Sequence, residues 1–243
     1  MGTDKRTLVL FPGAWGNQTE LVARWWFRNV INYFSDYQIV VVTYKGESMN
    51  EMVLHAIRQL EPVPNGSLAL AYSMGAQIAR GVAVRRTDLF KKVALISGLE
   101  RFGVRFSVLL TSLTFALRPI LRTLFGKPLM LDTQSQVRRI FAQATQEDDA
   151  KSLSTELFDR HMHAESGWAS IQMFLPPLRV WMPRFPCPVM AIIPEHDFLL
   201  PSPTYRGEQV QKIRVTGDHS LLCGSETRLR LHLMRLRSWF ELP

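Results

Sequence analysis

The chain of 243 residues has little cysteine, with only Cys187 and Cys223. Two thiols are too few for a disulfide framework or for a zinc site built from cysteines. Thiols that stay reduced are typical of a reducing compartment. We therefore expect both cysteines to be free and the protein to be cytoplasmic.

Long apolar runs are also missing. The longest charge-free apolar run, Phe106–Leu117, is shorter than the roughly 20 residues that span a bilayer. Residues 1–6 lead into an apolar run of about five residues, whereas a secretory signal needs about 7–15. We expect no signal peptide and no stable insertion into a membrane.

Acidic residues are fewer than basic ones, 21 against 29, which gives a formal net charge of +8. Such an excess can attract nucleic acid, anionic membranes or acidic proteins. The basic residues are scattered, however, with only short pairs such as Arg85-Arg86, and no nucleic-acid-binding motif accompanies them. We expect no nucleic-acid partner, and the sequence leaves the oligomeric state open.

The composition, 47% hydrophobic and 21% charged, is typical of a globular domain. Strand-like segments at residues 7–11, 38–44, 67–72 and 92–97 alternate with helix-like segments at 18–34, 49–60 and 74–86. This alternation predicts an α/β fold with right-handed βαβ units and a parallel sheet that has helices on both faces. The β-branched run at 38–44 predicts a strand covered on both sides.

The pattern changes after residue 99. Residues 100–186 have helical patterns and no strand signal, and they end in a proline cluster that comprises Pro176, Pro177, Pro183, Pro186 and Pro188. Strand signals return at 188–193 and 211–215, and a helix is predicted at 226–240. We therefore predict a sheet of about six strands in a core domain of residues 1–99 and 187–243. A helical lid of residues 100–186 is inserted after the fourth strand, because substrate-covering elements are grafted on loops.

Ser73 lies in Ala71-Tyr72-Ser73-Met74-Gly75, at the junction of a predicted strand and helix. A serine on such a turn stands above the carboxyl edge of the sheet, where ligands bind in open α/β folds. The pentapeptide resembles the G-x-S-x-G nucleophile elbow of the α/β-hydrolase superfamily, with Ala71 in place of the first glycine. The alternative is a serine that only caps the helix.

The resemblance implies a nucleophilic serine, then an acid, then a histidine, each on a loop after a strand. Asp197 follows the predicted strand at 188–193, and His219 follows the one at 211–215. We predict Ser73 as nucleophile, His219 as base and Asp197 as the carboxylate that orients the base. Glu195 is the alternative acid.

Acyl transfer also needs two N–H donors for the carbonyl oxygen that becomes negative. The resemblance implies the amide of Met74, which follows the nucleophile, and an amide of the loop after the first strand. Members of the superfamily commonly have His-Gly in that loop, and this chain has Pro12-Gly13, so we infer Ala14 as second donor, with Trp15 as the alternative. We expect the substrate to contact Trp15, Tyr72 and Phe198.

The function implied is a carboxylic ester hydrolase that acts on a hydrophobic or medium-chain ester, a small-molecule substrate, through an acyl-enzyme. The sequence has no G-x-G-x-x-G loop, phosphate loop or metal-ligand cluster, so we expect no cofactor and no metal. One alternative is an esterase or thioesterase whose substrate is carried by an acidic acyl-carrier protein, as in cleavage of pimeloyl-carrier methyl esters. Another is a non-catalytic small-molecule receptor on the same fold.

Overall fold

A parallel sheet forms the centre of the molecule. The computed structural model describes residues 5–99, 106–142, 147–162, 164–174, 184–200, 205, 209–222 and 226–242. In this part of the chain six strands pair in the order β2-β1-β3-β4-β5-β6, and all neighbours are parallel. The prediction of a parallel sheet of about six strands is confirmed. The strands are β1 (Thr7–Phe11), β2 (Gln38–Val41), β3 (Ser67–Tyr72), β4 (Phe90–Ile96), β5 (Val189–Pro194) and β6 (Val210–Val215).

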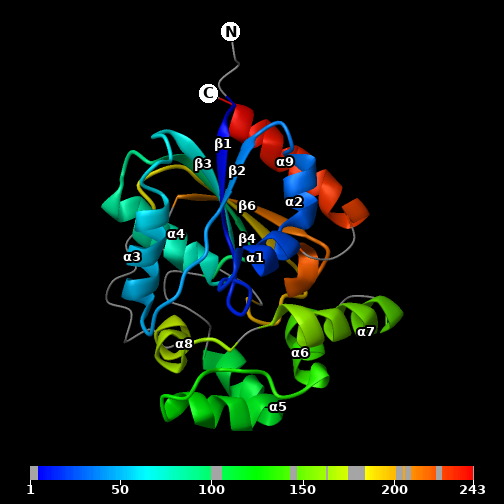
Figure 1. Cartoon of the computed structure of the whole chain (residues 1–243). Helices are drawn as coiled ribbons and strands as arrows, with labels where there is room; N and C mark the ends of the chain where they lie inside the picture. Colours follow the sequence, from blue (N-terminus) through cyan, green and yellow to red (C-terminus); the bar gives the residue numbers. More distant parts are fainter. Residues whose placement is uncertain are drawn as a thin grey trace.

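Helices cover both faces of this sheet, as predicted. Figure 1 shows α3 (Met49–Gln59) and α4 (Gly75–Arg85) on one face. On the other face lie α1 (Glu20–Trp26), α2 (Arg28–Tyr33) and α9 (Glu226–Glu241). Within each layer the helices touch, α3 against α4 and α2 against α9. Every residue of β1, β3 and β5 is buried between these layers.

Two expectations about the N-terminal half were wrong. The run at 38–44 forms the shorter strand β2, whose residues are exposed or half-buried because it lies at the edge of the sheet beside β1 alone. The segment 18–34 forms two helices, since Phe27 has φ of −97° and ψ of 11°. Trp26 is the last residue of α1, Phe27 lies at the break, and both aromatic side chains are buried.

A group of helices, which we call the helical segment, lies between β4 and β5. It contains α5 (Phe106–Leu124), α6 (Gln134–Phe141), α7 (Glu147–Glu156), the turn Leu157–His161 and α8 (Gly167–Phe174). Figure 1 shows the segment beyond one end of the sheet, opposite the two chain termini. Glu100, Pro176, Pro177, Pro183 and Cys223 lie outside the described residues, so the predicted boundaries of a lid domain stay a prediction. Cys187 is a half-buried free thiol.

The longest helix of this segment, α5, is bent. Ala116 has non-helical φ and ψ angles, and Pro119 lies inside the helix. Proline cannot donate to the carbonyl four residues earlier. That carbonyl, of Phe115, accepts a hydrogen bond of 2.9 Å from the side-chain amide of Gln136 in α6. None of the helices in the described ranges is long and apolar enough to cross a membrane.

The turn between β3 and α4 is packed directly against the end of β1. A Cβ atom added at Gly75 would lie 2.3 Å from the carbonyl oxygen of Phe11 and 2.5 Å from that of Pro12. Both are backbone atoms of a central strand and its loop, so they cannot move aside without disturbing the sheet. Glycine at position 75 therefore allows α4 to begin at this point.

We predict that Gly75→Ala lowers the free energy of unfolding by about 3 kcal/mol, which corresponds to a fall in Tm of roughly 6–12 °C. The control is Gly126→Ala, where φ is +74° and an added Cβ meets nothing within 4 Å. Its cost is only that of a left-handed backbone, about 1 kcal/mol. Thermal unfolding followed by circular dichroism measures both, and an equal loss in the two variants would contradict the packing argument.

Candidate active site

Three polar side chains meet at the carboxyl ends of the parallel strands. Ser73 follows β3, Asp197 follows β5, and His219 begins a short 3-10 helix, His219–Leu222, after β6. Parallel strands present their carboxyl ends at one edge, so side chains distant in the sequence can meet there. All three are buried.

Ser73 occupies a strained turn. Its φ is 51°, in the left-handed region that residues other than glycine seldom adopt. Backbone hydrogen bonds hold it there: its N–H donates to the carbonyl of Ile96 at 3.3 Å, and its own carbonyl accepts from Ala76 and Leu99 at 3.1 and 3.0 Å. The turn directs the hydroxyl toward the loops after β5 and β6.

His219 connects Ser73 with Asp197. Its Nδ1 lies 3.0 and 2.9 Å from the two carboxylate oxygens of Asp197, and its Nε2 lies 3.0 Å from Ser73 Oγ. A carboxylate only accepts hydrogen bonds, so Nδ1 carries the hydrogen and Nε2 keeps a lone pair directed at the serine. The Asp197 carboxylate also accepts from the amides of Leu199 and Leu200 at 3.0 and 3.1 Å. Glu195, the alternative acid, is exposed to solvent.

Two aromatic rings hold the imidazole of His219 in place. The Tyr72 ring centroid lies 5.2 Å from that of His219, and the Phe141 centroid lies at 5.3 Å. The Tyr72 hydroxyl donates a 2.6 Å hydrogen bond to the carbonyl of His219. Tyr72 thus braces the loop after β6, and its contact with substrate stays a prediction. Phe141, from α6, had no sequence signal that distinguished it from an ordinary core residue.

Two backbone amides near Ser73 are free. In the part of the chain that the structure describes, the amides of Met74 and Ala14 have no hydrogen-bond partner. The amide of Trp15, in contrast, donates to the Glu165 carboxylate at 3.3 Å. Trp15 has φ of 66°, so the loop after β1 turns sharply at this residue. The neighbouring amides of Ala14 and Trp15 therefore differ in what they can still bind.

Glu165 was not expected from the sequence. It lies in the helical segment before α8, pairs with Leu129 through two backbone hydrogen bonds of 2.8 and 2.9 Å, and is 1% exposed. Its carboxylate binds the amide of Trp15, and the carbonyl of Leu129 accepts from the Trp15 indole at 3.3 Å. The hydrogen-bonded pair Glu165 and Leu129 thus binds both the backbone amide and the indole of Trp15. The contact joins residues 150 positions apart, and no local pattern marks it.

Burial raises the pKa of the Glu165 carboxyl to about 7, although hydrogen bonds from the amides of Trp15 and Ser166 and from the Asn17 side chain oppose the shift. Tyr44 is the titratable group that faces it, and burial together with the Glu165 charge raises the pKa of the Tyr44 phenol. The Tyr44 hydroxyl donates to the carbonyl of Pro12. These buried polar groups surround the loop after β1.

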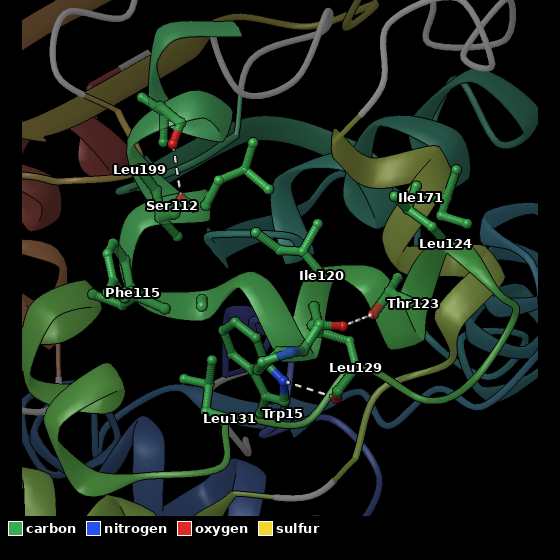
Figure 2. A pocket seen from close by; sticks show the side chains of 15 residues that line it. Trp15, Ser112, Phe115, Ile120, Thr123, Leu124, Leu129, Leu131, Ile171 and Leu199 are labelled. Atoms are coloured by element: carbon green, nitrogen blue, oxygen red, sulfur yellow. Dashed lines mark hydrogen bonds between the residues drawn. The ribbon is translucent and has the colours of Figure 1, made fainter.

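An apolar cavity of about 200 Å³ lies between this loop and α5 (Figure 2). Trp15 and Leu199 line it from the sheet side, and residues of α5 form most of the remaining wall. Its three polar side chains are already bonded: Ser112 to the carbonyl of Val108 at 2.8 Å, Thr123 to that of Pro119 at 2.9 Å, and Trp15 to Leu129. The cavity therefore offers a guest apolar contact and no free hydrogen-bonding side chain. Phe198, an expected substrate contact, packs on the lining residue Phe115 with centroids 5.5 Å apart.

The described residues contain no cluster of three or more histidine, cysteine, aspartate or glutamate side chains that could hold a metal ion.

The buried carboxyl of Glu165 predicts a pH-dependent stability. Between about pH 4.5 and pH 7 the folded chain keeps a proton that the unfolded chain releases, so the free energy of unfolding falls as the pH rises through this range, by up to about 3 kcal/mol. Glu165→Gln cannot ionise and should lack this decrease, so its stability relative to wild type should be higher at pH 8 than at pH 5.

Urea unfolding of both proteins at the two pH values measures the effect. Glu61→Gln is the control, because Glu61 is exposed and its replacement should leave the pH dependence unchanged. If Glu165→Gln keeps the pH dependence of the wild type, the raised pKa is refuted.

Of protein-family models, curated protein sequences and solved structures, only solved structures match the chain. Among solved structures, it is similar to an extracellular α/β-hydrolase from a Paenibacillus species, which shares structural and functional homology with tobacco salicylic acid binding protein 2. The identity is 13%, the TM-score 0.67, and the match covers 94% of this chain and 97% of the other.

It is also similar to 2-hydroxy-6-oxo-6-phenylhexa-2,4-dienoate hydrolase from a Rhodococcus species (15% identity, 96% and 91% covered, TM-score 0.63). A third similar structure is a carboxylesterase from Bacillus subtilis (12% identity, 98% and 85% covered, TM-score 0.59). These likenesses extend over nearly the whole chain and agree with the observed sheet and helix layers. The chain has the α/β-hydrolase fold.

Proposed function

We propose that the protein is a serine hydrolase that cleaves carboxylic esters of apolar acyl groups through an acyl-enzyme. The observation that carries the proposal is the buried hydrogen-bonded chain from Ser73 Oγ through His219 to Asp197. A serine hydroxyl becomes an effective nucleophile only when an oriented base takes its proton. The 3.0 Å between Ser73 Oγ and His219 Nε2 suits transfer of the hydroxyl proton. The 2.9 Å between His219 Nδ1 and Asp197 suits a hydrogen bond that orients the imidazole.

In the first half of the reaction, Ser73 Oγ attacks the ester carbonyl carbon while His219 Nε2 takes the hydroxyl proton. Asp197 accepts the Nδ1 hydrogen bond of the resulting imidazolium and stabilises its charge. The tetrahedral intermediate then expels the alcohol, which leaves with the proton from Nε2, and the acyl group stays on Ser73. In the second half, water gives a proton to His219 Nε2 and attacks the acyl carbon. The second tetrahedral intermediate then breaks its bond to Ser73 Oγ, which takes the proton back from Nε2, and the acid is released.

The negative oxygen of each tetrahedral intermediate needs two donors. We assign these to the amides of Met74 and Ala14, which have no partner in the described structure. Trp15 is the weaker candidate because its amide already donates to Glu165. A pair of fixed donors of this kind contributes several kcal/mol to transition-state stabilisation.

The cavity beneath α5 indicates the size and polarity of the acyl group that the site would bind. Trp15, which lines it, follows Ala14 directly, and Leu199, which also lines it, is two residues from Asp197. An apolar cavity of about 150 Å³ can hold a benzene-sized guest. By proportion, the cavity of about 200 Å³ fits an apolar chain of roughly eight carbon atoms. A carboxylated or hydroxylated acyl chain would lose hydrogen bonds to water there and find none in return.

The helical segment would act as the lid of this site. It lies beyond one end of the sheet (Figure 1). Phe141 and Glu165 join it to His219 and to the loop after β1, on the side where Ser73 follows β3. Exclusion of water by such a cover strengthens the electrostatic contacts of the reacting atoms. The similarity to a carboxylesterase and to another hydrolase of the same fold agrees with the proposal.

The proposal predicts that Ser73→Ala lowers kcat for p-nitrophenyl esters by roughly 10⁴-fold or more, because the nucleophile is removed. Ser97→Ala is a matched control: Ser97 is also a buried serine that follows a parallel strand, with φ of 46°. Its replacement should change kcat little. Turnover that survives in Ser73→Ala at the level of Ser97→Ala would exclude Ser73 as the nucleophile.

The cavity predicts chain-length selectivity. Ile120 projects into the middle of the cavity (Figure 2), so Ile120→Phe should fill part of it. We expect kcat/KM for the octanoate ester to fall about 10- to 100-fold relative to the acetate ester. The control Leu117→Phe changes the same helix at an exposed position outside the lining. Equal effects of the two variants on the octanoate-to-acetate ratio would show that acyl groups bind elsewhere.

A further inference from the structure

The outer side of α5 carries large apolar side chains that face solvent. Leu117, Leu121 and Phe125 are 51%, 44% and 81% exposed. Together with Arg118, Arg122 and Lys127 they line one shallow surface groove. We call these six residues the α5 patch. Large exposed apolar groups of this kind mark a binding surface when they gather in one place.

The charge of the α5 patch is positive. Asp132 pairs with Arg122 at 3.4 Å and lies 4.0 Å from Arg118, with its own side chain only 22% exposed. It is the only acidic residue of the sequence between residues 106 and 142, against five lysines and arginines, which are Arg118, Arg122, Lys127, Arg138 and Arg139. A partner for this patch must therefore be both apolar and anionic.

The α5 patch and the apolar cavity lie on two sides of the same helix, and Leu124 lies between them. Leu124 is 56% exposed and also lines the cavity. Pro119, Ile120 and Thr123 line the cavity from the other side of the same helical turns, so a single helix separates the patch from the cavity. Figure 2 shows Leu124 beside Ile171 at one end of the ring of lining side chains. Leu124 is therefore the point at which an acyl chain would have the shortest route from the side of the patch into the cavity.

The position of α5 makes the patch accessible to a large flat object. Figure 1 shows α5 as the outermost element of the molecule, at the end opposite the two termini. The charges argue against a second copy, because a two-fold dimer through this patch would oppose its cations to the same cations. Three large apolar side chains are also few for a stable protein interface, which buries about 1,200 Å² or more.

We propose that the α5 patch docks on the surface of an anionic lipid bilayer, and that the ester substrate passes from the bilayer into the cavity at Leu124. Leucine and phenylalanine side chains would enter the boundary between headgroups and acyl chains, while arginine and lysine remain at the lipid phosphates. The association is peripheral and reversible. The substrate route rests on the proposed function, whereas the docking itself does not.

The experiment is flotation of the full chain with two kinds of vesicle, phosphatidylcholine alone and an equal mixture with phosphatidylglycerol, at about 0.15 M salt. We expect binding to the mixed vesicles and at least about tenfold weaker binding to phosphatidylcholine alone. The double variant Leu121→Glu/Phe125→Glu should bind the mixed vesicles at least about tenfold more weakly. The variant Arg118→Gln/Lys127→Gln should bind several-fold more weakly.

The control variant is Leu231→Glu, on α9, where the leucine is likewise exposed, at 53%. It should bind as the wild type does. Docking on lipid is overturned if the wild type does not float with mixed vesicles, or if Leu121→Glu/Phe125→Glu floats as well as Leu231→Glu. It is equally overturned if light scattering shows a dimer that this double variant dissociates, or if the chain binds an acidic acyl-carrier protein through the patch and not vesicles.

A second readout separates docking from catalysis. Soluble p-nitrophenyl butyrate should be hydrolysed equally by wild type and Leu121→Glu/Phe125→Glu, since neither residue lines the cavity. A long-chain ester held in mixed vesicles should be hydrolysed at least about tenfold more slowly by the variant, in proportion to its lost binding. Vesicle binding without hydrolysis of either ester would refute the proposed function and leave docking intact. Equal hydrolysis of the vesicle ester by both proteins would refute the proposed substrate route.

Discussion

Close packing between the turn at Ser73 and the loop after β1 places the proposed nucleophile and the two proposed oxyanion donors. Gly75 leaves no room for a side chain against the carbonyls of Phe11 and Pro12, and the strained backbone of Ser73 is held by hydrogen bonds to its neighbours. This contact brings the amides of Met74 and Ala14 to the same region as the serine hydroxyl. The sheet topology supplies His219 and Asp197 from the two strands at the far edge.

The helical segment is coupled to this arrangement through buried polar contacts as well as apolar ones. Glu165 and Leu129 bind the backbone and indole of Trp15, and Trp15 both follows the proposed oxyanion donor and forms a wall of the cavity. A movement of α5 or of the Leu129–Glu165 bridge would therefore change the cavity and the oxyanion loop together. The same helix carries the α5 patch on its outer side, so contact with a lipid surface would act at the element that closes the acyl cavity.

Strands and site loops could be predicted from the sequence because their signals are local. Short apolar runs predicted β3 and β5 nearly to the residue, and the order of Ser73, Asp197 and His219 after strands predicted three side chains that the structure brings within hydrogen-bonding distance. The edge position of β2 could not be predicted, since β2 and its neighbours have similar composition, and the break at Phe27 interrupts a pattern that is helix-like on both sides. Glu165 and Phe141 were missed because their contacts join distant parts of the chain. The choice between Ala14 and Trp15 likewise needed the partner of each amide.

Ser73 is the residue that the proposed reaction acylates, and covalent trapping can identify it without knowledge of the natural substrate. The folded chain would be treated with a fluorophosphonate, which reacts with serines activated by a neighbouring base, and examined by intact mass and peptide mapping. We expect one phosphonyl group per chain, on Ser73, absent from Ser73→Ala and from chain unfolded before treatment. An unlabelled folded chain, or a label on Ser97 or another serine, would contradict it.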